Sequence, residues 1–483
     1  MAVVRGGEVV TPAGVGTWDV GIAGERIAAV ALPGTLRADG ARVIEAHGKI
    51  VIPGGIEPHA HASFRFVYPW ARDAGHRAAG PDAVSKACAF GGTTTVLDFA
   101  NWRPGGTLSD AIEERDAHFR GSSLVDYSFH TVLVGMGTEG ATAEHPVAIP
   151  LSLIPQVREV IAGGFTSVKV WTTNTTSTRA RQMTDLGHVY GIMREVAAAG
   201  GVLAVHAEDE DLVMYMSRVL HDRGTIDARF LADAHPAISE DISFRRVIRL
   251  AEWTGATIYF MHVSAREGIN AVSEARARGL PVYAETLHHY ATFPKDVYAT
   301  PEGPLYHTYP SLKERADNEA LWEGLVGGPI DTVATDAILC GRALKLGGRT
   351  IEDTVGGSPG VEERLAITYT EGVAKRGMTL QRFVDVTSAN AARIFGMYPR
   401  KGAIAPGSDA DIVLLDPTPR TLQASTLHAV DHSIWDGWQV AAWPTMTMLR
   451  GQVIVADGRL LTDRAAGQLV RGRVTPRDIL RGH

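Results

Sequence analysis

Two histidines, His59 and His61, follow an apolar run and the turn Pro53-Gly54-Gly55. Their i, i+2 spacing places both imidazoles on one side of an extended segment. Neutral imidazole is the commonest nitrogen ligand for zinc-type cations, so this pair can hold one metal ion. Two ligands leave an ion under-coordinated, and two solvated turn histidines are the plainer interpretation of the pair alone. A metal site therefore requires further histidines and a carboxylate elsewhere in the chain.

Four more polar residues interrupt or end apolar segments that have the composition of strands. Lys169 lies inside one such segment, His206 and His262 end two others, and Asp336 ends the last. Each has an ordinary structural explanation, since a strand lysine can snorkel to solvent and a strand-end aspartate can cap a loop. Together with the first pair, they put metal-binding side chains at five expected strands. This joint pattern favours one shared site.

The elements that must position these residues alternate between buried strands and amphipathic helices. Helices are expected over Leu108–Phe119, Leu186–Ala199, Ser239–Trp253, Ala265–Arg278 and Asn318–Leu325. The expected strands are Ile50–Ile56, Thr93–Phe99, Val125–Val134, Thr166–Trp171, Val202–Ala207, Thr257–Val263, Pro281–Leu287 and Asp331–Asp336. Eight strand–helix units predict an α/β protein with a (β/α)₈ TIM-type barrel. In that fold the chemistry lies at the carboxyl ends of the strands.

Both ends of the chain have β character. Short strands with Gly-rich turns fill the first 50 residues, and more strands follow a short helix beyond residue 386. We therefore predict a small β-sandwich domain formed from residues 1–50 and 386–483, with the barrel over residues 51–385. The tail after Leu461 alternates Arg and Gly and is expected to be exposed or bound to a partner.

Composition excludes several classes of function. The 483 residues carry 47 basic and 54 acidic side chains, a net charge of −7, without a basic run that would follow nucleic acid. No apolar stretch approaches the roughly 20 residues of a membrane helix, and the N-terminus lacks the apolar core of a signal peptide. Two cysteines, Cys88 and Cys340, suit a reducing compartment. We expect a cytoplasmic protein that acts on a small molecule, with neither nucleic acid nor membrane as a partner.

Several motifs of the chain resemble the amidohydrolase superfamily, and within it the cyclic amidohydrolases dihydropyrimidinase, hydantoinase, allantoinase and dihydroorotase. The resemblance covers nearly the full length. It is carried by Pro53-Gly54-Gly55-Ile56-Glu57-Pro58-His59-Ala60-His61, by Ser167-Val168-Lys169-Val170, by Gly357-Ser358-Pro359-Gly360-Val361-Glu362-Glu363-Arg364, and by Tyr398-Pro399-Arg400-Lys401-Gly402 before the Asp409-Ala410-Asp411 turn. Together these motifs point to the hydantoinase-like branch.

The resemblance implies two divalent metal ions, with zinc first and manganese, iron or cobalt as alternatives. It implies a bridge between the ions made by an N-carboxylated lysine, because a neutral lysine in a nonpolar strand can take up carbon dioxide to form an anionic carbamate. The implied ligands are His59, His61 and Asp336 for one ion, His206 and His262 for the other, and Lys169 for both.

The implied reaction is hydrolysis of the amide C–N bond of a cyclic amide or ureide by a metal-bridging hydroxide. Asp336 is the implied catalytic residue, which takes the proton on attack and passes it to the leaving nitrogen. Glu57 is interpreted as orienting a metal ligand, and fixing the turn is a comparable alternative. By analogy with the family, a homodimer or homotetramer is expected.

The chain departs from the family pattern where substrate is bound. Asn174 stands where ring-opening relatives carry an oxyanion-supporting tyrosine, although it could equally be loop filler. Tyr309 begins the segment that replaces their Ser-Pro-Pro-Leu-Arg, Gly356 replaces an asparagine, and Ala337 replaces a histidine. We assign substrate contacts to Asn174, Tyr309 and Gly356 and expect poor turnover of dihydrouracil and simple hydantoin. Alternatives are hydrolysis of an acyclic amide, imide or carbamate, or a non-catalytic dihydropyrimidinase-like assembly protein.

Overall fold

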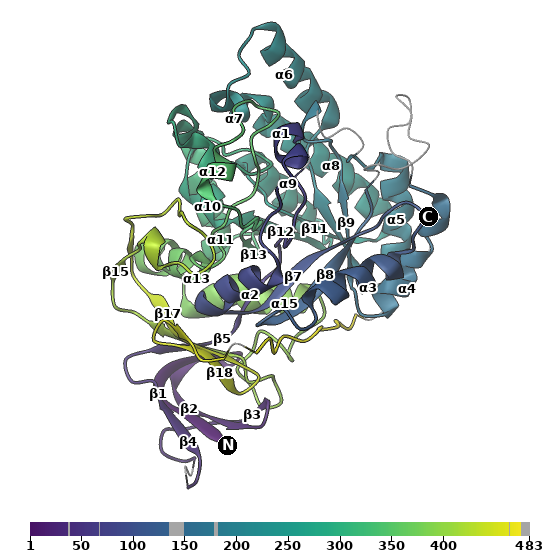
Figure 1. Ribbon diagram of the computed structural model, residues 1–483. Helices are drawn as coiled ribbons and strands as arrows, with labels where there is room; N and C mark the ends of the chain where they lie inside the picture. The colour runs from purple at the N-terminus through teal and green to yellow at the C-terminus, as the bar shows by residue number, and fades with distance from the viewer. Residues whose placement is uncertain (37–38, 67, 135–148, 178–181, 463, 475–483) are drawn as a thin grey trace.

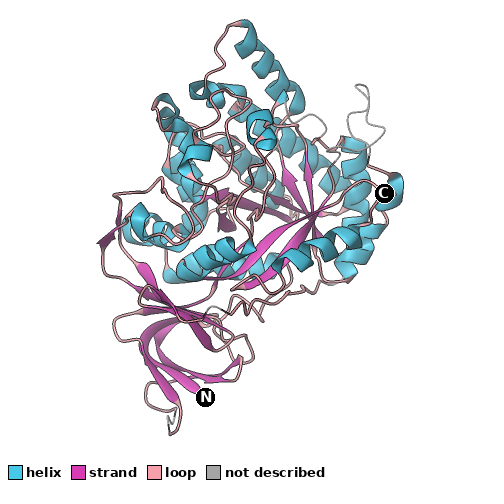
Figure 2. Ribbon diagram, viewed as in Figure 1, coloured by secondary structure: helices cyan, strands magenta, loops and turns pink. Residues whose placement is uncertain are grey.

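A computed structural model describes residues 1–36, 39–66, 68–134, 149–177, 182–462 and 464–474. Its centre is a sheet of eight parallel strands in which each strand pairs with the next one along the chain, flanked by helices (Figures 1 and 2). This confirms the predicted (β/α)₈ barrel. The barrel strands are β6 (Gly55–Glu57), β7 (Thr93–Asn101), β8 (Asp126–Val132), β9 (Ser167–Trp171), β10 (Val202–His206), β11 (Thr257–Phe260), β12 (Val282–Leu287) and β13 (Thr332–Ala334).

The longer helices cover the outside of the barrel with their apolar faces inward. Two of them keep the predicted bounds because a polar cap fixes each start: Thr107 forms a capping box at α3, and Asp185 accepts from two backbone N–H groups at α5. The helices are α2 (Pro81–Phe90), α3 (Leu108–Phe119), α4 (Gln156–Ala162), α5 (Leu186–Ala199), α6 (Glu210–Asp222), α8 (Ala237–Thr254), α9 (Arg266–Ala277) and α11 (Arg315–Gly327), with shorter ones at α1 (Pro69–Asp73), α7 (Leu231–Ala234), α10 (His288–Thr292), α12 (Arg342–Lys345), α13 (Arg364–Thr368), α14 (Leu380–Val384) and α15 (Asn390–Ile394). In the described part of the chain, no helix has the length and apolar character to cross a membrane.

The first and last barrel strands, β6 and β13, meet without a continuous ladder. Just beyond their carboxyl ends, a single parallel bridge joins Ala60 to Ala337. Below it, the buried Glu57 side chain accepts from the N–H of Thr335 at 3.2 Å, while Arg364 donates to the carbonyl oxygen of Val333 at 2.9 Å. Glu57 and Arg364 also form an ion pair at 3.2 Å with no exposed surface. Side chains therefore replace ladder hydrogen bonds at this seam.

The chain ends build a second, mostly antiparallel sheet of nine strands, in the order β19-β18-β17-β14-β5-β1-β2-β3 with β4 paired to β1 (Figure 1). This confirms the small β unit made from both termini. Its strands are β1 (Ala2–Thr11), β2 (Gly14–Ala23), β3 (Arg26–Ala31), β4 (Arg42–Glu45), β5 (Ile50–Pro53), β14 (Ile412–Asp416), β17 (Trp443–Leu449), β18 (Gln452–Ala456) and β19 (Arg459–Leu460), and β15 (Arg420–Thr421) pairs separately with β16 (Gln439–Val440). The domain boundaries near residues 50 and 385 stay a prediction.

The single strand expected over residues 50–56 is wrong. β5 pairs with β1 and β14 in the terminal sheet, whereas β6 pairs with β7 in the barrel. Gly54 lies between them, and a Cβ atom there would stand 2.0 Å from Oγ1 of Thr94. Only glycine fits this close crossing, so the chain changes sheets at that residue.

A buried cluster of charges joins the two sheets. Nζ of Lys401 lies 2.5 Å from Asp126, 2.9 Å from Asp409 and 2.7 Å from Asp411, and Arg450 also pairs with Asp126. Asp126 begins barrel strand β8, whereas Asp411 directly precedes β14 of the terminal sheet. Asp409 also pairs with Arg26 and Arg400, so each of the three carboxylates has a cationic partner, and these ion pairs hold the sheets together.

The tail after Leu461 was expected to be exposed or bound to a partner, but part of its described length packs against the barrel. Val470 is fully buried, and the backbone of residues 467–473 bonds to Ser123, Tyr127, Gly164 and Gly396. In Figure 1 this yellow segment runs from the terminal sheet along the barrel. Residues 475–483 lie outside the described residues.

Candidate active site

A cavity of ≈ 60 Å³ lies at the carboxyl ends of the barrel strands. All the metal ligands predicted from the sequence line it, which is where the fold places chemistry. Its lining consists of His59, His61, Phe64, Lys169, Trp171, Thr175, Gln182, His206, His262, Tyr309, Asp336, Ile338, Gly356 and Gly357.

The histidines after β6 converge on the carboxylate after β13. Nε2 of His59 lies 3.2 Å from Oδ1 of Asp336, and Nε2 of His61 lies 3.1 Å from the same oxygen. The three side chains place ligand atoms within 4.8 Å of one another, as a metal site requires. Phe99 of β7 stacks on the His61 ring at 4.3 Å, which fixes the plane of that ring.

Glu285 of β12 orients this group, and it was missed in the sequence. Its Oε1 lies 2.8 Å from Nδ1 of His59, and its Oε2 accepts from the Tyr259 hydroxyl at 2.7 Å. A carboxylate on Nδ1 leaves Nε2 of His59 free to face the cavity. A glutamate within an apolar strand was the available sequence signal.

A second pair of histidines lies across the cavity. Nδ1 of His206 stands 3.0 Å from Nε2 of His262, so two ring nitrogens point at one place. The other nitrogen of His206 lies 3.0 Å from Oε2 of Glu208, whose Oε1 is 2.8 Å from Nδ1 of His235. Glu208 thus fixes the ring of His206 as Glu285 fixes that of His59. The sequence analysis did not single out Glu208 either.

Lys169 lines the same cavity as the two histidine pairs. It is completely buried, its Nζ is 4.7 Å from the Trp171 ring, and its hydrogen-bond partner is Sδ of Met261 at 2.8 Å. Burial lowers the pKa of Lys169 to about 7, although Glu285 and Asp336 oppose the shift. A neutral amine is therefore accessible near neutral pH.

The charges around the first pair suit a cation. Burial alone would raise the pKa of Asp336, but His59 and His61 hold it well below its usual value, so this carboxylate stays ionised. Burial would lower the pKa of His59, but Asp336 and Glu285 raise it to about 9. Asp336 and His262 also have φ angles of 49° and 41°, a strained backbone conformation that is common at functional sites.

The donors present fit two divalent ions. Imidazole nitrogens and carboxylate oxygens suit zinc and other first-row metals. His262 Nδ1 is buried without a hydrogen-bond partner, while its Nε2 faces His206. His59, His61 and Asp336 could hold one ion and His206 and His262 the other, with Lys169 between them.

Two of the three predicted substrate-contact residues line the cavity, and the third does not. Tyr309 and Gly356 line the cavity, whereas Asn174 does not. The Asn174 amide donates to Glu210 at 2.6 Å and accepts from the N–H of Gln182 at 2.8 Å, so both of its ends are occupied by the loop. Asn174 as an oxyanion donor is therefore not supported by this geometry. Thr175 and Gln182 face the cavity instead.

Residues 50–454 match the model of the amidohydrolase family. The chain belongs to the amidohydrolase family. Within this family it is 32% identical over 476 residues to a D-hydantoinase of Geobacillus stearothermophilus, covering 97% of this chain and 96% of the relative. It is likewise 32% identical over 484 residues to a D-hydantoinase of Streptomyces coelicolor, covering 98% and 97%.

Solved structures of family members superpose on this structure over nearly its full length. The crystal structure of dihydropyrimidinase from Brevibacillus agri superposes with a TM-score of 0.88 at 32% identity and covers 98% of this chain and 99% of that one. An L-hydantoinase from Arthrobacter aurescens gives 0.82 at 26% identity, covering 97% and 99%. The terminal sheet and the barrel are thus both shared with these proteins.

Proposed function

We propose that this protein hydrolyses the amide C–N bond of a cyclic amide or ureide. The observation that carries the proposal is the convergence of two histidine pairs and Asp336 on the buried Lys169 in one cavity. Relatives named hydantoinase and dihydropyrimidinase match nearly the whole chain, which supports the same reaction class.

When bound, two divalent ions would polarise the scissile carbonyl and lower the pKa of a water molecule. Lys169 would help to hold both ions. Its low pKa leaves a neutral amine that can add to carbon dioxide and release one proton, and the resulting carbamate would offer two oxygens that share one negative charge. Zinc is the proposed metal, with manganese, iron or cobalt as alternatives that the same ligands accept.

Asp336 is the proposed proton carrier. It stays ionised, lies at the carboxyl end of β13 beside His59 and His61, and lines the cavity in which a substrate carbonyl would sit. It can accept a proton from the attacking water and return it to the leaving nitrogen. Trp171, Phe64 and Ile338 surround this position with apolar surface that limits access of other water molecules.

A turnover screen of the metal-loaded protein tests the proposal. Hydantoins, dihydropyrimidines, allantoin, cyclic imides and simple carbamates would be offered, and ring opening of at least one cyclic amide is expected. An Asp336→Asn variant with the same metal content should lose nearly all of that activity. Turnover confined to acyclic amides or carbamates, or none with two ions bound, would contradict the proposal.

We also propose a homodimer or homotetramer in the cytoplasm. The oligomer is supported by resemblance to the family, and the compartment by the two cysteines, both buried and unpaired. Light scattering over a range of concentrations should give a mass of two or four chains, and a monomer throughout would contradict it.

A further inference from the structure

One wall of the cavity is built from two segments that are distant in sequence, residues 307–309 and 354–357. Tyr309 lines the cavity from the first of these wall segments, and Gly356 and Gly357 line it from the second. A substrate held against the proposed ligands would therefore lie against both. The position of one wall segment relative to the other sets the width of the cavity.

The wall segments are tied together directly. The Tyr309 hydroxyl donates to the carbonyl oxygen of Thr354 at 3.2 Å, and the N–H of Gly357 donates to Oγ1 of Thr308 at 2.7 Å. The ring of Tyr309 also packs on the backbone of Gly356 so closely that a Cβ atom there would stand 2.6 Å from Cδ2 of the ring. A small displacement of either segment would therefore shift the other one as well.

Lys345, the last residue of α12, is buried beneath this wall with no exposed surface. Its Nζ donates to the carbonyl oxygens of His307 at 2.9 Å, Val355 at 2.7 Å and Gly357 at 2.9 Å. One acceptor belongs to the first wall segment and two to the second. All three ammonium hydrogens are therefore used to hold the wall segments at one point.

Among the described residues, the three carbonyl oxygens are the hydrogen-bond partners of this cation, and Asp336 adds attraction from a longer distance. A buried charge is costly unless every donor is satisfied, and charge-assisted hydrogen bonds are about twice as strong as neutral ones. Burial lowers the pKa of Lys345 to about 8, which leaves it mostly protonated at neutral pH. The arrangement favours one fixed geometry of the wall.

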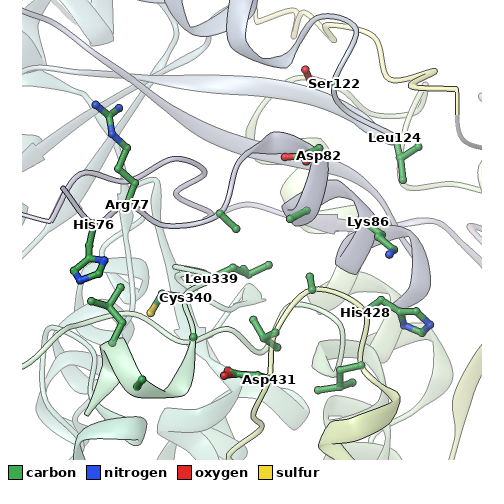
Figure 3. A pocket seen from close by; sticks show the side chains of 18 of the residues that line it. His76, Arg77, Asp82, Lys86, Ser122, Leu124, Leu339, Cys340, His428 and Asp431 are labelled. Atoms are coloured by element: carbon green, nitrogen blue, oxygen red, sulfur yellow. The ribbon is translucent and has the colours of Figure 1, made fainter. Parts of the chain in front are cut away.

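The chain that leads into Lys345 separates the cavity from a second hollow. Ile338 lines the cavity, while the next residues line an open groove of ≈ 1460 Å³ on the other side. Figure 3 shows Leu339 and Cys340 on this groove, opposite Asp82 and near Asp431. Lys345 therefore acts from behind a thin layer of chain and does not itself line the cavity.

We infer that Lys345 is a positioning residue that fixes the substrate-facing wall and thereby sets the affinity for the ring of a cyclic amide. The inference rests on the proposed function for its substrate, but the effect on the wall itself is independent of it. Because the wall segments hold no metal ligand, loss of Lys345 should weaken substrate binding more than the chemical step.

The test compares Lys345→Met with Arg382→Met. Arg382 of α14 is a matched control, since it also donates to backbone carbonyls, those of Leu325 at 2.7 Å and Ile330 at 2.6 Å, but at the amino end of β13 away from the cavity. Hydrogen–deuterium exchange measured by mass spectrometry follows the wall segments, and metal analysis counts bound ions. Steady-state kinetics on the cyclic amide that the turnover screen identifies separate KM from kcat.

In Lys345→Met, we expect faster exchange in both wall segments, unchanged metal content, and a KM at least about tenfold higher with kcat changed less than threefold, since misplacement by about 1 Å can cost 10²-fold. Arg382→Met should change neither the exchange of the wall nor KM. If Lys345→Met does not fold, Thr308→Val serves in its place, because it removes the hydrogen bond from Gly357 to Thr308. It should also give faster exchange in the wall segments and a higher KM, with smaller changes than those expected for Lys345→Met.

Unchanged exchange in the wall segments of both test variants would overturn the inference, as would faster exchange with unaltered KM. If the native protein opens none of the cyclic amides of the turnover screen, the proposed function fails separately. In that case the exchange comparison still decides whether Lys345 fixes the wall.

Discussion

At the scale of single residues, Lys169 is the side chain on which the site depends most. Among the described residues that line the cavity, it is the lysine proposed to bridge the two ions, so Lys169→Ala should lose most bound metal and activity. Small carboxylates such as formate or propionate should restore part of both, because they can supply the missing anionic oxygens. Metal analysis after gel filtration measures the loss, with Lys86→Ala in the surface groove as the control. Two tightly held ions in Lys169→Ala would exclude the bridge.

Glu285 makes a second prediction at this scale. Glu285→Gln keeps the size of the side chain but removes the charge that orients His59. Substitution of a residue that orients a metal ligand typically lowers metal affinity by about 10–100-fold. Titration against a chelator should show this loss for one of the two ions, while Glu208→Gln should weaken the other, held by His206. Equal affinity of both ions in the two variants would contradict this division of roles.

The sequence predicted the residues whose chemistry is unusual for their position. A lysine, histidines and an aspartate in apolar strands were visible without a structure, and the fold brings all of them to one cavity. For Asn174 the sequence left an oxyanion donor and loop filler as alternatives. The choice depends on Glu210, a residue of α6 that no local pattern connects with Asn174, and their hydrogen bond favours the loop role. Glu285 was overlooked because a strand glutamate next to no other motif is usually structural.

At the scale of elements, the seam between β6 and β13 is the unusual part of the barrel. Arg364→Met would leave Glu57 buried without its counter-charge, and breaking a buried pair in this way typically costs about 3–5 kcal/mol. The unfolding midpoint in urea should fall accordingly. The double variant Glu57→Gln, Arg364→Met should recover part of the loss. A double variant less stable than Arg364→Met would show that the charge of Glu57 is not the cause.

Helix bounds were predictable where a cap marks them, but strand membership was not. The run from Ile50 to Ile56 is apolar throughout, and hydrophobic pattern alone cannot tell which sheet each half joins. Pairing with strands that are distant in sequence decides the sheet of each half: β5 pairs with β14, and β6 pairs with β7.

At the scale of the whole molecule, the buried charge cluster governs how the two sheets stay joined. Lys401→Met would remove the cation that lies between Asp126, Asp409 and Asp411. Arg450 would still pair with Asp126, and Arg26 and Arg400 with Asp409, but Asp411 would lose its ion-pair partner, a loss of about 3–5 kcal/mol at neutral pH. Burial already raises the pKa of Asp411, aided by Asp126 and opposed by Lys401, so removal of the lysine raises it further.

A carboxylate whose pKa is higher in the folded than in the unfolded state binds its proton more tightly when folded. Its destabilising effect is therefore greatest above the folded pKa and fades as the pH falls below it. Thermal unfolding of Lys401→Met should show its largest deficit against the native protein at pH 7–8 and a smaller one near pH 5. A deficit that grows on acidification would contradict this explanation.

The position of β5 also has a consequence for how the protein is made. β5 leaves the ribosome early, but its partner β14 begins only at Ile412, roughly 360 residues later. At a synthesis rate of about 5–20 residues per second, the edge of β5 waits roughly 20–70 seconds for that partner. Throughout this interval an apolar strand that is buried in the finished protein shows open backbone donors and acceptors, which is the arrangement that recruits strands from other chains. Recovery of soluble protein from an expressing cell should thus depend on what shields this edge during translation, even when the completed molecule is stable.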